Sequence, residues 1–195
     1  MTALTPALLR SAQTLGFTQS SDALTGGLLA TLAASKPGGR FLELGTGVGA
    51  GSAWLLSGMD RDSSLVTVER NAEQVEVARN HLGGDPRITF WVGDGLEFLR
   101  QALEPFDFIF ADTWPGKIEQ PELALNLVAP GGFYVVDDME LGWKDEAELY
   151  DVDGYLLGIW RGQRALMDVL AARDDFTCTR LEWSTGLMVC AKKGV

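Results

Sequence analysis

The chain has 195 residues, 46% of them hydrophobic, and 16 Lys and Arg stand against 27 Asp and Glu, for a formal net charge of −11. This length fits one domain with a full core, and the acidic balance argues against a nucleic-acid partner, which usually needs a basic face. No apolar run approaches the length of a membrane span, and the start lacks the features of a signal peptide. We therefore expect a cytoplasmic protein with no membrane partner, and we expect Cys178 and Cys190 to be buried free thiols in a reducing compartment.

Two helices are predicted before the first strand, over residues 3–15 and 24–33. Asp22 is a suitable N-cap for the second, which the Lys36-Pro-Gly-Gly39 segment ends. We assign residues 1–36 to an N-terminal helical cap and residues 37–195 to the main domain. The sequence leaves open whether these helices cover a site, pair subunits or pack on a sheet.

A buried strand over residues 40–44 runs directly into a glycine-rich turn, after which an apolar helical pattern begins. Gly45, Gly47 and Gly49 stand at alternate positions, where the backbone must turn sharply and leave room for a ligand. Glu43 lies inside the apolar strand. A carboxylate there is costly unless it is hydrogen-bonded, so we expect the amides of the loop or a cationic ligand to satisfy it.

Strands and helices then alternate along the chain, which indicates βαβ units and a parallel sheet. Strands are predicted at 64–69, 87–92, 106–111 and 133–136, with helices at 71–82, 96–103 and 118–128. Residues 137–153 form a strongly acidic segment, which is either a solvated loop or a mobile lid. A long helix over 155–172 and a hairpin of strands at 176–183 and 187–192 complete the chain.

The Glu43-Leu-Gly-Thr-Gly-Val-Gly49 segment resembles the first motif of class I S-adenosylmethionine-dependent methyltransferases. The resemblance implies an α/β, Rossmann-like fold: a seven-stranded sheet of order 3-2-1-4-5-7-6 with strand 7 antiparallel, plus the N-terminal helices. It also implies that the methionine part of S-adenosyl-L-methionine lies over this loop. The residues it assigns to the cofactor there are Glu43, Gly45, Thr46, Gly47 and Gly49.

Carboxylates stand at or beside the ends of the remaining parallel strands, where ligands bind in such sheets. Glu69, followed by Arg70, is placed to accept the ribose hydroxyls of a nucleotide. Asp94, followed by Gly95, stands where methyltransferases commonly receive the adenine amino group, although an N-cap role competes. Asp112 ends the fourth strand and completes the predicted cofactor set.

The segments around Asp112 and Asp137-Asp138 resemble those of small-molecule O-methyltransferases of the catechol and caffeoyl-CoA types. In that family an Asp and an Asp-Asn pair hold a divalent cation, which implies Mg²⁺ or a similar ion at Asp112, Asp137 and Asp138. Asp138 stands where the family has Asn, and the usual lysine close behind the first Asp is missing. Lys117 is the candidate base in its place. Without a metal, Asp112 or Asp138 would orient the acceptor or take its proton.

The predicted function is therefore methylation of a hydroxyl on a small-molecule acceptor, with Asp112, Lys117 and Asp138 as catalytic candidates. Trp114, Trp143 and Trp160 are candidates to line the acceptor pocket, whereas His81 is expected to be structural. A homodimer is expected by analogy with the family. Two alternatives stay open at this point. A nicotinamide-dependent oxidoreductase is one, because Gly45-x-Gly47-x-x-Ala50 fits a dinucleotide loop. A non-catalytic S-adenosylmethionine-binding protein is the other.

Overall fold

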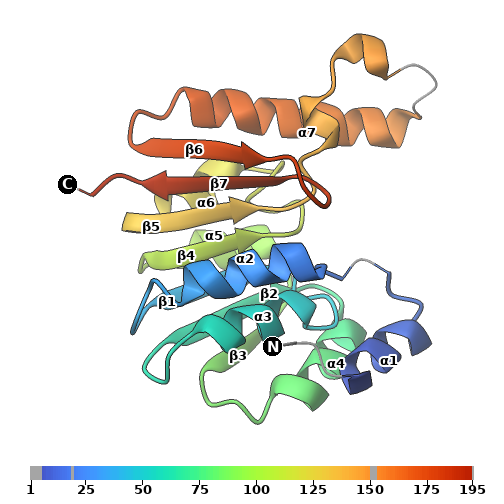
Figure 1. The fold of residues 1–195 in the computed structure, drawn as a ribbon, viewed down its shortest axis with the longest axis vertical. Coiled ribbons are helices and arrows are strands. Elements are labelled where there is room, and N and C mark those ends of the chain that lie inside the picture. The colour runs from blue at the N-terminus through green and yellow to red at the C-terminus, as the bar shows by residue number, and fades with distance from the viewer. Residues whose placement is uncertain (1–5, 19, 150–152, 195) are drawn as a thin grey trace.

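The computed structural model describes residues 6–18, 20–149 and 153–194 and contains one seven-stranded sheet of order β3-β2-β1-β4-β5-β7-β6 (Figure 1). The strands are β1 Arg40–Leu44, β2 Ser64–Glu69, β3 Ile88–Val92, β4 Phe106–Ala111, β5 Val128–Val136, β6 Phe176–Leu181 and β7 Leu187–Lys192. The first five pair in parallel, and β7 runs antiparallel to both β5 and β6. The predicted strand order and the antiparallel seventh strand are confirmed.

Helices cover both faces of the sheet, because side chains along each strand alternate between them (Figure 1). The helices are α1 Pro6–Thr14, α2 Ala23–Ala33, α3 Ala50–Gly58, α4 Ala72–Leu82, α5 Gly95–Gln101, α6 Pro121–Asn126 and α7 Gly154–Ala171. On one face, Phe41 packs with α2 and α3. On the other, Leu42 packs with α5, α6 and α7. This two-sided burial gives a three-layer core, and it leaves the strand ends for binding.

The N-terminal helices pack on the rest of the chain in two different places. Leu29 of α2 is fully buried with the first face of the sheet, and Gly26 lies so close to α3 that a Cβ would be 2.2 Å from the Trp54 ring. The α1 helix instead contacts α4, where Ser11 Oγ lies 3.0 Å from His81 Nε2. This contact agrees with the structural role expected for His81. Residues 3–5 of the first predicted helix lie outside the described residues, and the division at residue 36 stays a prediction.

The sequence misplaced the boundary between α6 and β5. The predicted helix over 118–128 begins only at Pro121, whose ring suits the first turn of a helix, and it ends at Asn126. The predicted strand from Phe133 begins instead at Val128, which pairs with Phe106 before the register shifts. Residues 117–120 are therefore loop and not helix, and this places Lys117 in a segment that follows the end of β4.

The prediction of free cysteines was wrong. Cys178 and Cys190 are opposite each other in the β6–β7 pair, with 4.0 Å between their Cα atoms, and a disulfide joins them. No local pattern determines the register of the hairpin, and the register decides whether two cysteines 12 positions apart can meet. The expected reducing compartment, which rested on free thiols, therefore loses its support.

The acidic segment after β5 contains two short 3₁₀ turns, η1 Leu141–Trp143 and η2 Glu146–Glu148, before it reaches α7. The indole nitrogen of Trp160 in α7 donates to the Lys144 carbonyl at 3.0 Å and holds this segment to the helix. Tyr150 and Asp151 of the predicted lid lie outside the described residues. Within the described ranges, no helix combines the length and apolarity needed to cross a bilayer.

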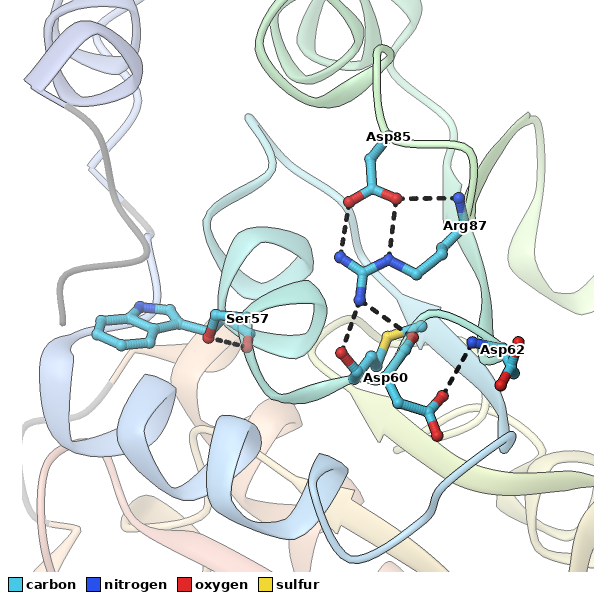
Figure 2. A network of polar contacts seen from close by, with 7 residues as sticks. Ser57, Asp60, Asp62, Asp85 and Arg87 are labelled. Atoms are coloured by element: carbon cyan, nitrogen blue, oxygen red, sulfur yellow. Dashed lines mark hydrogen bonds and ion pairs between the residues drawn. The ribbon is translucent and has the colours of Figure 1, made fainter.

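The loops at the amino-terminal edge of the sheet are held by one arginine (Figure 2). The Arg87 guanidinium donates to both carboxylate oxygens of Asp85, at 2.7 and 3.0 Å, and to the carbonyls of Met59 and Asp60, at 2.7 and 3.2 Å. This bidentate hydrogen bonding holds the pKa of Asp85 below its usual value. Arg87 thus ties the start of β3 to the turn that follows α3.

Candidate active site

The predicted site residues lie at or just after the carboxyl ends of the five parallel strands, β1 to β5. The chain leaves β1 through α3 to β2 on one side, and β4 lies on the other side of β1. In open parallel sheets, ligands bind beyond the carboxyl ends of the strands at such a reversal of strand order.

The glycine loop has the backbone shape that the sequence predicts. Gly45, Gly47 and Gly49 all have positive φ, at 101°, 49° and 94°, which other residues rarely adopt. The loop is closed onto its neighbours: the Gly45 amide donates to the Val68 carbonyl at 2.9 Å, and a Cβ on Gly45 would lie 2.7 Å from the Asp112 carbonyl oxygen. The loop and the end of β4 are therefore in direct contact.

Glu43 is fully buried beneath this loop, and two hydroxyls satisfy one of its oxygens. Thr67 Oγ1 donates to Oε2 at 2.6 Å and Ser52 Oγ donates to the same atom, whereas Oε1 has no hydrogen-bond partner among the described residues. The expectation that loop amides would hold this carboxylate was wrong, because the side chain lies against α3 and β2. Burial, with a smaller effect of the nearby Glu69, raises the pKa of Glu43 to about 7.

Glu69 ends β2 beside the loop and makes two hydrogen bonds to the backbone. Its carboxylate accepts from the Gly47 amide at 3.2 Å and from the Asn71 amide at 2.9 Å. Thr46 is buried and shares a hydrogen bond with Thr67, while Arg70 is exposed. The structure thus brings Glu69 and the loop together and leaves Arg70 at the surface.

Asp94 is the N-cap of α5, as the competing interpretation of this residue requires. Its Oδ1 accepts from the Glu97 amide at 3.0 Å, and the rest of its carboxylate is exposed. Gly95 is buried, with Pro115 so close that a Cβ would lie 2.7 Å from the proline ring. The capping hydrogen bond therefore fixes the orientation of the Asp94 side chain after the end of β3, and the carboxylate can still accept further hydrogen bonds.

Three aspartates meet at the ends of β4 and β5. Burial first, and then the charge of Asp137, raise the pKa of Asp112 well above its usual range. Asp137 is buried, and its Oδ1 accepts from Thr185 Oγ1 at 2.6 Å and from the Asp138 amide at 2.8 Å. Burial raises the pKa of Asp137 as well. Like charges in a crevice oppose ionisation, and this is a common state of acids that move protons.

Asp138 differs from its two neighbours, because its side chain is exposed and its backbone has a φ of 54°. Asp is one of the few residues that tolerate this left-handed conformation. Gln163 of α7, which is buried, donates to the Asp138 carbonyl and accepts from the Gly142 amide. The turn after β5 is therefore fixed by α7.

Lys117 is buried, with 6% of its surface exposed, although it lies in a loop. The loop is held by Tyr134, whose hydroxyl donates to the Gly116 carbonyl at 2.6 Å. The Lys117 ammonium lowers the pKa of both Asp112 and Asp137, against the larger effect of burial. The structure therefore brings this lysine into the acidic cluster, where the sequence left its position open.

Several residues of the site were missed by the sequence analysis. Thr185 and Gln163 hold the two aspartates after β5, and Ser52 and Thr67 hold Glu43. Phe17 follows α1 and lies on the glycine loop, where a Cβ on Gly47 would be 2.7 Å from its ring. Only Thr185 had a signal: with β7 antiparallel beside β5, the turn before β7 must reach the end of β5.

The residues present fit S-adenosylmethionine on two observations. Gly49 caps α3 without any side-chain hydrogen bond, so the first amides of that helix can bind an anionic group such as a carboxylate. Glu69 offers acceptor oxygens at the end of β2, which is the strand end where Rossmann-like folds bind the ribose of a nucleotide.

The fit to a divalent cation is poor. Within the described residues, no three carboxylate, imidazole or thiolate side chains are arranged to hold a metal ion. Oδ1 of Asp137 already accepts two hydrogen bonds, and Lys117 places a positive charge in the same cluster. Hard cations need several free, converging oxygen ligands, and here the occupied oxygen of Asp137 and the nearby ammonium oppose such binding.

Comparison with known proteins points in one direction. A Mycobacterium avium protein provisionally named O-methyltransferase is 34% identical over 147 residues, which cover 70% of this chain and 65% of that protein. The match thus spans less than two thirds of the length of this curated relative. The O-methyltransferase TomG from Streptomyces achromogenes, involved in tomaymycin synthesis and solved in complex with SAM, is 29% identical, with a TM-score of 0.80 over 98% of this chain and 91% of its own.

An O-methyltransferase from Bacillus cereus in complex with SAH shares the fold, with a TM-score of 0.82, 23% identity, and coverage of 95% of this chain and 89% of that one. Residues 42–139, about half of the chain, match the family described as methyltransferase domain. That region runs from β1 to the turn after β5 and includes the glycine loop and all three aspartates. The chain therefore belongs to the methyltransferase-domain family.

Proposed function

We propose that this protein is an S-adenosylmethionine-dependent O-methyltransferase that acts on a hydroxyl of a small molecule. The observation that carries the proposal is the contact between the glycine loop and the acidic cluster. The Asp112 backbone lies against Gly45, so an acid of raised pKa borders the cofactor loop. The related O-methyltransferases support the same assignment. They do not favour the nicotinamide alternative, which explains the loop and Glu69 but not the aspartates.

The cofactor side of the crevice consists of groups that bind and orient. S-Adenosylmethionine supplies, when bound, a methyl group on a positively charged sulfur. The amides at the start of α3 are assigned to bind its carboxylate, Glu69 its ribose hydroxyls and Asp94 its adenine amino group, which their positions at the strand ends support. Glu43 acts from below by fixing Ser52 and Thr67, and thereby the loop.

The acceptor side contains the groups that handle the proton. Asp112 is assigned to take the proton of the acceptor hydroxyl, because a carboxyl group of raised pKa is better matched to that task than an ordinary one. Lys117 is assigned to stabilise the oxygen as it loses the proton, since a buried ammonium acts strongly in a low-dielectric crevice. Asp138, at the exposed end of the cluster, is assigned to orient the acceptor.

We assign a flat acceptor on the basis of one aromatic pair. Trp114 and Tyr155 stack with their ring centroids 6.0 Å apart, and both are largely exposed, at 43% and 62%. Trp114 lies two positions after Asp112, so its ring is available as a wall for a flat acceptor. Trp143 packs against the core and Trp160 bonds the Lys144 carbonyl, which leaves Trp114 as the strongest of the three predicted candidates.

The test is calorimetric titration with S-adenosylhomocysteine, followed by turnover of S-adenosylmethionine against a panel of phenols and alcohols. The proposal predicts one site per chain and methylated oxygen on a subset of the panel. Absence of binding to S-adenosylhomocysteine together with binding of NAD⁺ would refute the cofactor assignment. Binding without turnover on any acceptor would favour the non-catalytic alternative. A homodimer and a cytoplasmic location stay predictions from the sequence.

A further inference from the structure

Lys117 is the one Lys or Arg that is buried within the part of the chain that the structure describes. Burying an ammonium group is unfavourable unless negative charge or hydrogen bonds compensate it. Its position is fixed from two sides, since the Tyr134 hydroxyl holds Gly116 and the Lys117 amide donates to the Trp114 carbonyl at 3.1 Å. The loop after β4 thus holds the backbone of Lys117 in a fixed position.

That place is the cluster at the ends of β4 and β5. The ammonium interacts electrostatically with both Asp112 and Asp137, the two more deeply placed of the three aspartates. None of the ion pairs among the described residues includes Lys117, so the ammonium acts on the two carboxylates electrostatically and not through a direct contact. Because no carboxylate closes an ion pair with it, its charge stays available to a further oxygen.

The aspartates are also held in a way that suits a hydrogen-bonded cluster better than a metal. Thr185 Oγ1 and the Asp138 amide both donate to Oδ1 of Asp137, and the exposed Asp138 is turned by its positive φ. A metal at Asp137 would compete with both donors for the lone pairs of this oxygen. It would also lie beside a like-charged ammonium, which is unfavourable in a low dielectric.

We propose that the Lys117 ammonium takes the place of a divalent cation in this chain, and that it supplies the positive charge at the acceptor oxygen without any metal. The inference rests on the proposed function for the identity of that oxygen. The charge arrangement itself, one lysine compensating Asp112 and Asp137, is independent of which reaction the crevice performs.

The experiment measures Mn²⁺ binding to the full chain, freed of metal, by calorimetry and by the paramagnetic resonance of the free ion. The parent protein should show no stoichiometric Mn²⁺ site, and its affinity for S-adenosylhomocysteine should be the same in EDTA and in Mn²⁺. The Lys117→Met variant removes the charge and keeps an unbranched side chain one atom shorter, so Mn²⁺ should bind about tenfold more tightly or better. Lys193→Met, at an exposed lysine, should gain nothing.

A stoichiometric Mn²⁺ site in the parent that Asp112→Asn abolishes would overturn the inference. So would a Lys117→Met variant that still binds S-adenosylhomocysteine and yet gains no Mn²⁺ affinity. If Lys117→Met does not fold, the parent arm decides alone. If the parent does not bind S-adenosylhomocysteine, the cofactor assignment is refuted, but the Mn²⁺ measurement still tests the role of Lys117. Failure of the proposed function and failure of this inference are therefore distinguishable.

Discussion

Aspartates at the amino-terminal edge of the sheet, where the parallel strands begin, differ in pKa from those at the carboxyl-terminal edge, where the strands end. At the amino-terminal edge, Arg87 binds both oxygens of Asp85 and lowers the pKa of that carboxyl (Figure 2). At the carboxyl-terminal edge, burial and neighbouring acids raise the pKa of Asp112 and Asp137, and their nearest cation, Lys117, closes no ion pair among the described residues. The same residue type thus ties loops together at one edge and is kept ready to bind a proton at the other.

The difference separates a structural charge from a functional one. A carboxylate paired with a cation stabilises the fold, whereas acids that raise one another's pKa destabilise it near neutral pH. Such acids are therefore more common at functional sites. Paired charges are expected where loops must be held, and unpaired ones where chemistry occurs. Substitutions at the two edges should therefore affect different properties.

The largest effect is expected from Asp112→Asn. It removes the proposed proton acceptor, so turnover should fall roughly 10²- to 10⁴-fold. The free energy of unfolding should stay the same or rise, because one member of an acidic cluster is neutralised. The measurements are initial rates with the acceptor found by screening, and urea unfolding.

Asp85→Asn is the matched control at the other edge. It should leave turnover within about twofold and lower the free energy of unfolding by about 1 kcal/mol, as the loss of a partly exposed ion pair does. If Asp85→Asn reduced turnover as much as Asp112→Asn, the separation of the two edges would be wrong.

The second effect concerns pH. The pKa of Glu43 rises from 4.5 to about 7 on folding, so folding takes up a proton between these values. The stabilisation is complete below pH 4.5 and is lost as pH rises through about 7. Glu43→Gln should remove that loss. Relative to the parent, the free energy of unfolding of the variant should therefore rise by at most roughly 3 kcal/mol between these two pH values.

Urea unfolding of both proteins at pH 5 and pH 8 measures the effect of Glu43→Gln. The exposed Glu119→Gln is the control and should show no such difference. An identical pH dependence in parent and Glu43→Gln would contradict the assignment of this buried acid.

The third effect is expected from Gly45→Ala, which should lower the free energy of unfolding by about 1–3 kcal/mol. The substitution combines a φ of 101° with a Cβ that would lie 2.7 Å from the Asp112 carbonyl oxygen. The affinity for S-adenosylhomocysteine should fall with it, because the loop must move away from β4. Gly27→Ala is the matched control: a Cβ there has nothing within 4 Å in the middle of α2, and Ala is the better helix former. Equal effects of the two substitutions would show that the contact between loop and β4 is unimportant.

The smallest effect is expected from Thr185→Val, which removes the donor to Asp137 Oδ1 and should cost about 1 kcal/mol of stability. Because that hydrogen bond lowers the pKa of Asp137, the pH–rate profile should also shift toward higher pH. Thr185→Ser keeps the hydroxyl and should restore both properties. A Ser variant as impaired as the Val variant would assign the effect to packing.

The sequence predicted the fold and the cofactor half well, because both depend on local patterns. Alternate glycines permit the positive φ that such a turn needs, and alternating strands and helices favour a parallel sheet, so the shape of Gly45 to Gly49 and the parallel strands followed from local patterns, and the strand order from the family resemblance. Where a local signal was ambiguous, the prediction was wrong: Pro130-Gly131-Gly132 lies within β5 and does not precede it.

The acceptor half depends on contacts between distant parts of the chain, and no local pattern encodes them. Nothing in the sequence around Lys117 indicates that a loop lysine will be buried, since Tyr134, from the next strand, holds that loop. Glu43 was recognised as a buried acid, but its partners Ser52 and Thr67 lie 9 and 24 positions away. The Cys178–Cys190 disulfide likewise depends on a hairpin register that only the three-dimensional structure supplies.

A crystal structure of the protein soaked with S-adenosylhomocysteine would show whether the carboxyl ends of the strands bind this compound. We expect its amino-acid part to lie over Gly45 to Gly49, with the ribose at Glu69, the adenine at Asp94 and the sulfur facing Asp112 and Lys117. Density for the compound elsewhere, or a crevice that instead accepts a dinucleotide across the same strand ends, would contradict it.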